Sequence, residues 1–132
     1  MKKSTIASTA LILACATLHT GCASTPSPTS NKWRIEFDGS AKSAGEIGLQ
    51  LVGVDQSTIA EVTTKIAAGT GENHVARRVA DELTISLPRN RYSVEVDDGE
   101  DVLIKKRRGV EDFEVRLSAN SVVGVSIDLE RE

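Results

Sequence analysis

Alternation of apolar and polar residues predicts three strands between residues 33 and 67. Residues 33–38 alternate apolar with charged side chains, which is typical of a strand with one buried face. The same period of two recurs over residues 47–51 and 58–67, and Gly53 ends the second strand. The inward-facing positions are Trp33, Ile35, Phe37, Ile47, Leu49, Leu51, Ala60, Val62, Thr64 and Ile66.

One amphipathic helix is predicted over residues 72–86, where the apolar spacing changes from two to three and four. Charged residues such as Arg78 and Asp81 fall on the opposite side of this helix. Thr70 is the expected N-cap, and Pro88 closes the helix because the residue before a proline avoids the helical region. The apolar stripe consists of Val75, Ala76, Val79, Ala80 and Leu83.

A β-hairpin is predicted around Gly99. A two-residue turn would oppose Val96 to Asp101 and place a carboxylate among apolar side chains. A three-residue loop over residues 98–100 opposes Val96 to Val102 instead. We expect this second register, because a shift of one residue moves every side chain to the other face of a strand.

A second hairpin is predicted from the alternation over residues 113–117 and 123–129, with a turn at residues 119–121. The element order is then three strands, one helix and four strands (βββαββββ). Short hairpin connections favour an antiparallel sheet, and one helix can cover one face of it. We therefore expect an α+β domain that is mainly antiparallel sheet, with a β-sandwich carrying one helix as the alternative.

The N-terminal segment has the layout of a secretion signal. Lys2 and Lys3 precede an uncharged, mostly apolar run over residues 6–18. This run is too short for the roughly twenty residues of a membrane-spanning helix and matches the apolar part of a signal peptide. Two small residues, Thr20 and Gly21, then lead to Cys22.

This arrangement resembles the precursors of bacterial lipoproteins, in which a cysteine after a small residue is lipidated and becomes the first residue of the mature chain. The resemblance implies lipidation of Cys22, with palmitate among the acyl chains. The family usually has Leu or a similar residue where this chain has His19, and Cys15 is the alternative lipid site. The Ser/Thr/Pro composition of residues 23–31, typical of a linker, favours Cys22.

We therefore expect a signal peptide at 1–21, a lipidated cysteine and flexible linker at 22–31, and a single compact domain at 32–132. Two or three acyl chains would hold the protein stably on a membrane. In the lipoprotein family Ala23 implies the outer membrane, facing the periplasm, if the source has two membranes.

Composition narrows the functions open to the domain. Removal of Lys2 and Lys3 takes the formal charge from −3 to −5, and an acidic chain is poorly suited to nucleic acid. Aromatic residues, which stack on sugars and bases, are scarce. With Cys15 removed and Cys22 lipidated, the domain has no thiol for a disulfide, so its stability depends on its core.

The sequence offers little for catalysis or cofactor binding. His74 is the one histidine beyond the signal, too few for a usual zinc site, and no nucleophile marks it as a catalytic base. Gly69-Thr70-Gly71 lacks the further glycine and lysine of a phosphate-binding loop. We expect no cofactor and no metal, with calcium as a minor alternative at a hairpin tip whose spacing is not that of an EF-hand. That tip carries Asp97, Asp98, Glu100 and Asp101.

The strongest charge run is basic and adjoins the far end of the same hairpin. Such a run on an anchored protein can contact an acidic partner or anionic headgroups, and it can equally be a solvated guard against edge pairing. The expected contact residues are Arg89, Arg91, Lys105, Lys106, Arg107 and Arg108.

These observations favour a non-enzymatic envelope lipoprotein that binds another envelope protein and contributes to an assembly. The alternative is a small envelope hydrolase, or an inhibitor of an envelope enzyme, that uses His74 with Glu72 or Asp81.

Overall fold

The computed structural model describes residues 28–132, which form seven strands and one helix in the predicted order βββαββββ. The α+β class with antiparallel strands is confirmed. The elements are β1 (Lys32–Gly39), β2 (Gly45–Gly53), β3 (Thr58–Ile66), α1 (Glu72–Ser86), β4 (Tyr92–Asp97), β5 (Asp101–Lys106), β6 (Phe113–Asn120) and β7 (Val125–Arg131).

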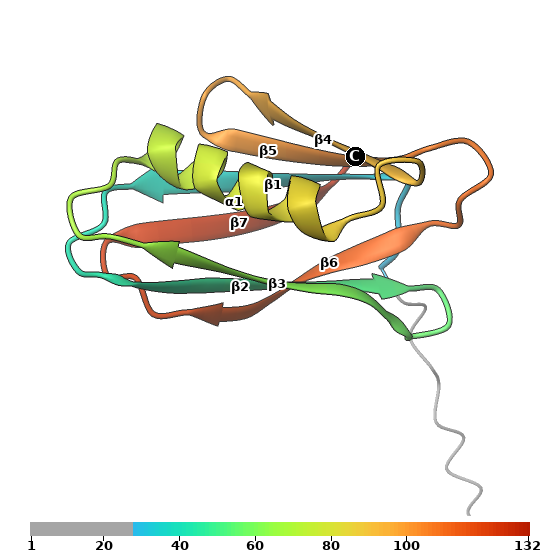
Figure 1. The fold of residues 1–132 in the computed structure, drawn as a ribbon, viewed down its shortest axis with the longest axis horizontal. Helices are drawn as coiled ribbons and strands as arrows, with labels where there is room; N and C mark the ends of the chain where they lie inside the picture. The colour runs from blue at the N-terminus through green and yellow to red at the C-terminus, as the bar shows by residue number, and fades with distance from the viewer. Residues whose placement is uncertain (1–27) are drawn as a thin grey trace, which may run out of the picture.

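The strands divide into two antiparallel sheets, as in the sandwich alternative. One sheet has the order β4-β5-β1-β7 and the other the order β3-β2-β6. The helix packs against β3 of one sheet and against β4, β1 and β5 of the other. It therefore lies along one side of the sandwich and contacts both sheets (Figure 1).

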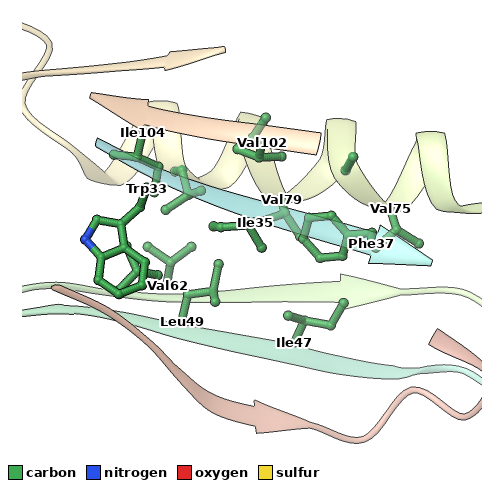
Figure 2. Close-up of a cluster of buried hydrophobic side chains, with 14 of the residues drawn as sticks. Trp33, Ile35, Phe37, Ile47, Leu49, Val62, Val75, Val79, Val102 and Ile104 are labelled. Carbon is green, nitrogen blue, oxygen red and sulfur yellow. The ribbon is translucent and has the colours of Figure 1, made fainter. Parts of the chain in front are cut away.

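The hydrophobic core lies between the two sheets and the helix. β1 contributes Trp33, Ile35 and Phe37, which are at most 5% exposed, as the alternation predicts. These side chains face Leu49 of β2 and Val79 of α1 (Figure 2). Within the described residues, the core cluster lies between Trp33 and Leu129.

The β4–β5 hairpin has the predicted three-residue loop. Val96 lies opposite Val102, and the same register pairs Val94 with Ile104. Gly99 has a φ of 88°, a left-handed conformation that favours glycine. The apolar pattern and the turn residues therefore specify this register together.

The second predicted hairpin is wrong. β6 continues to Asn120, within the predicted turn, and pairs with β2, whereas β7 pairs with β1 in the other sheet. Residues 121–124 connect β6 of one sheet to β7 of the other. The Asn120 side chain stabilises this connection, because it accepts a hydrogen bond from Val122 N at 3.1 Å and donates one to Val125 O at 3.1 Å. Val123, expected on the inner face, lies in this connection and is 60% exposed.

The helix has the predicted bounds, but Thr70 is not its N-cap. Gly71 occupies the cap position without a side-chain hydrogen bond, and the Thr70 hydroxyl donates to Ala67 O at 2.7 Å. Glu72, in the first turn, accepts a hydrogen bond from Gly39 N at 2.9 Å. The start of the helix is thus tied to the end of β1.

The expected signal peptide and both candidate lipid sites, Cys15 and Cys22, lie outside the described residues. Within residues 28–132, no helix has the length and apolar composition needed to cross a membrane.

Replacement of Phe113 by alanine tests the core. Its ring is fully buried and meets the Tyr92 ring edge-on, with centroids 5.4 Å apart. Phe113→Ala should lower the free energy of unfolding by about 3–5 kcal/mol, measured by urea denaturation of a protein that comprises residues 22–132. Leu117, on the same strand but 40% exposed, is the matched control, and Leu117→Ala should cost less than about 1 kcal/mol. Equal losses for the two variants would contradict this core.

Candidate functional site

The two predicted basic segments converge at one end of the domain. Arg107 joins them, because its backbone N–H donates to Arg91 O and its Nε donates to Arg89 O, both at 2.7 Å. We call this surface the basic end. It comprises Arg89, Arg91, Lys105, Lys106, Arg107 and Arg108.

The lysines and arginines of the basic end differ in their partners. Lys105 pairs with Glu95 at 3.0 Å and Lys106 with Asp112 at 2.6 Å. Exposed pairs of this kind contribute only about 0–1 kcal/mol and leave the lysines free to exchange partners. The remaining members form no ion pair with any residue of the described part of the chain, so their charge faces solvent. They are Arg89, Arg91, Arg107 and Arg108.

Two hollows of about 300 Å³ each flank Arg107. The first, which we call the helix-side hollow, lies between the end of α1 and the start of β4. The second, which we call the N-terminal hollow, adjoins the residues by which the chain enters β1. The helix-side hollow is lined by Thr84, Leu87, Arg89, Tyr92, Ser93, Val94 and Arg107. The N-terminal hollow is lined by Asn31, Lys32, Lys105, Lys106, Arg107 and Arg108.

The helix-side hollow combines an apolar floor with a cationic rim. Leu87 and Tyr92 are 4% and 3% exposed and belong to the core, and Arg89 and Arg107 are the charged residues of its lining. In the last turn of α1, Ile85 is 76% exposed. An apolar surface beside two guanidinium groups fits a ligand that carries both a carboxylate and an apolar group.

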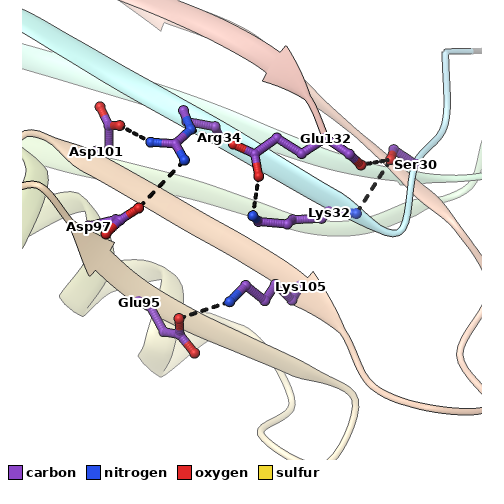
Figure 3. A network of polar contacts seen from close by, with 8 residues as sticks. All are labelled: Ser30, Lys32, Arg34, Glu95, Asp97, Asp101, Lys105 and Glu132. Carbon is purple, nitrogen blue, oxygen red and sulfur yellow. Dashed lines mark hydrogen bonds and ion pairs between the residues drawn. The ribbon is translucent and has the colours of Figure 1, made fainter.

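The acidic residues at the β4–β5 hairpin do not form a common site. Arg34 of β1 pairs with Asp101, which is 7% exposed, and reaches Asp97 at 3.5 Å (Figure 3). Asp98 and Glu100 lie in the loop itself. No group of three or more histidine, cysteine or acidic residues within residues 28–132 is placed to hold a metal ion.

His74 has no acid–base partner among the described residues. It is exposed on the first turn of α1, beside a hollow of about 290 Å³. Glu72, one of its two proposed partners, has its carboxylate on Gly39 N. Asp81, the other, lies about two helical turns further along, roughly 10 Å in rise. The geometry therefore does not assemble a catalytic pair.

A row of carboxylates crosses the outer face of the first sheet, and sequence patterns do not reveal it. Glu36 on β1 lies directly opposite Asp101 on β5 and Asp128 on β7. Desolvation and, next, the negative charges of Asp101 and of neighbouring carboxylates raise the pKa of Glu36. Glu132, by contrast, accepts from Lys32 and Arg34, and these hydrogen bonds lower its pKa (Figure 3).

The distribution of charge determines what this surface can bind. The arginines of the basic end attract anions, and the two hollows provide concave positions for them. The acidic row lies on the same sheet, toward the tip of the β4–β5 hairpin.

Comparison with known proteins finds no matching family model, and no similar curated protein or solved structure.

Replacement of Glu36 by glutamine tests the acidic row through the pH dependence of stability. The raised pKa means that the ionised Glu36 destabilises the folded state at pH values above that pKa. Glu36→Gln should therefore raise the Tm at pH 7, and the difference from the wild type should vanish near pH 3, where both side chains are neutral. Glu61→Gln on the exposed face of β3 is the control and should change the Tm little. A lower Tm for Glu36→Gln at pH 7 would contradict the repulsion.

Proposed function

We propose that this chain is a lipid-anchored protein of the bacterial cell envelope that binds another envelope protein and catalyses no reaction. The lipoprotein-like signal at 1–21, Cys22 and the linker support the anchoring. The helix-side hollow supports the binding. If the source has two membranes, the proposed location is the outer membrane, facing the periplasm.

The observation that carries the binding proposal is that Arg89 and Arg107 line the same hollow as the buried apolar residues Leu87 and Tyr92. Arginine pairs with carboxylates in a bidentate geometry, and partly buried apolar pockets supply much of the energy of protein interfaces. The guanidinium of Arg107 is oriented by its hydrogen bond to Arg89 O at 2.7 Å. The fitting partner is a protein segment with an acidic residue next to an apolar one.

Catalysis has less support. A hydrolase would need His74 to act with Glu72 or Asp81, and the hydrogen bond of Glu72 to β1 removes the nearer candidate. An inhibitor of an envelope enzyme would itself be a protein-binding module, and the same helix-side hollow would serve it.

Labelled palmitate tests the anchoring. Cells that express the wild-type precursor should incorporate the label into this protein, and the Cys22→Ser precursor should not, because the thiol that receives the lipid is absent. Cys15→Ser is the matched control and should label like the wild type. Full labelling of Cys22→Ser with loss in Cys15→Ser would move the lipid site to Cys15.

In-cell crosslinking followed by mass spectrometry tests the protein contact. The anchored wild type should yield one dominant envelope protein. An Arg89→Glu/Arg91→Glu variant should lose at least ten times in crosslinking yield, because it reverses one of the two cations of the rim, Arg89, and the neighbouring cation Arg91 of the basic end. Arg77→Glu/Arg78→Glu, a tandem exposed pair in the middle of α1, is the control with the same charge change and should keep the partner.

Retention of the partner by the Arg89→Glu/Arg91→Glu variant would remove the helix-side hollow from the contact. The catalytic alternative requires a hydrolytic activity that His74→Ala abolishes. An activity that disappears in this variant would overturn the non-enzymatic assignment.

A further inference from the structure

We propose that the N-terminal hollow binds the phosphate of an anionic phospholipid and holds the basic end against the membrane surface. This inference rests on the anchoring part of the proposed function. The proposed protein contact uses the helix-side hollow, and the lipid would use the N-terminal hollow. Arg107 is the one residue that lines both hollows.

The lining of the N-terminal hollow is suited to a phosphate. Five of its six residues are lysine or arginine, of which Lys32 is paired with Glu132, and no carboxylate is part of the lining. Lys105 and Lys106 pair with carboxylates that are themselves 55% and 45% exposed, so a phosphate can replace those partners. Arg107 and Arg108 form no ion pair with residues 28–132 and supply charge that is already available.

The path of the chain places this hollow beside the membrane anchor. Asn31 is part of its lining, and its carbonyl accepts a hydrogen bond from Lys106 N at 3.0 Å. Ser30 and Phe113 exchange two backbone hydrogen bonds at 2.8 and 3.0 Å, which fix the point of entry. Eight residue steps lead from Cys22 to Ser30, a span of at most about 28 Å. An anchored domain therefore keeps the hollow within a short distance of the headgroups.

The charge at the opposite end favours the same orientation. The tip of the β4–β5 hairpin carries Asp98 and Glu100 and lies at the far end of that hairpin from the basic end (Figure 1). An anionic surface repels the tip and attracts the basic end, and both effects act within a Debye length of about 8–10 Å. An acidic protein would also match the cations, but the linker places lipid headgroups nearest to this hollow.

Lysine footprinting of an anchored protein tests the proposal. The mature chain from Cys22 contains one cysteine, so its thiol can be coupled to a maleimide lipid in nanodiscs, which replaces natural lipidation. Acetylation rates of Lys105 and Lys106 are compared between discs of phosphatidylglycerol and of phosphatidylcholine. We expect at least fivefold protection on phosphatidylglycerol, lost at 0.5 M NaCl, while Lys42 and Lys65, which are exposed outside the basic end, stay unprotected.

An Arg107→Glu/Arg108→Glu variant should lose this protection, since each cation near an anionic surface changes binding about fivefold. The Arg77→Glu/Arg78→Glu variant, with the same change of charge, should keep it. Equal protection on the two lipids, or equal protection of Lys42 and Lys65, would overturn the orientation.

Two further experiments distinguish a phospholipid from other ligands of the N-terminal hollow. Protection by inorganic phosphate alone, at the concentration of phosphatidylglycerol headgroups, would assign the hollow to a free anion and overturn the lipid assignment. A third outcome is equal protection of Lys105 and Lys106 on the two lipids, together with loss of the crosslinked partner in the Arg107→Glu/Arg108→Glu variant. This outcome would assign these cations to the protein contact. Because the coupling is chemical and the partner test uses Arg89 and Arg91, a negative footprint leaves the proposed anchoring and protein binding standing.

Discussion

The fold depends on the inner face of β1, which packs against the second sheet and the helix at the same time. Its three large side chains are nearly fully buried, and the indole Nε1 of Trp33 donates to Phe113 O on β6 at 2.8 Å. This bond joins the two sheets directly. The same strand lies between β5 and β7, so two of the three strand pairings of the first sheet involve β1. Since the described domain contains no cysteine, this packing takes the place of covalent crosslinks.

Features with local causes could be predicted from the sequence. The β4–β5 register follows from an apolar pattern on both sides of one glycine, and the helix follows from a change of period between Gly71 and Pro88. Adjacent alternating segments favour a hairpin, so the sequence pairs β6 with β7, whereas their actual partners, β2 and β1, lie far away in the chain. No periodicity distinguishes a hairpin from a crossing between sheets.

The same distinction applies to the candidate site. A run of basic residues is visible in the sequence, but its union with Arg89 and Arg91 depends on two hydrogen bonds made by Arg107. The row formed by Glu36, Asp101 and Asp128 depends on β1 being the neighbour of both β5 and β7. Composition therefore predicts which charges are present, and strand order determines which of them meet.

The hydrogen bonds between Ser30 and Phe113 also define a mechanical property. If the anchor and a bound partner are both held at the basic end, a force between membrane and partner passes through Ser30, Asn31 and the loop that follows β5. The load path is short, because both attachments lie at the same end of the domain. The domain would then transmit force between membrane and partner through one of its ends, and the hydrophobic core would not carry the load.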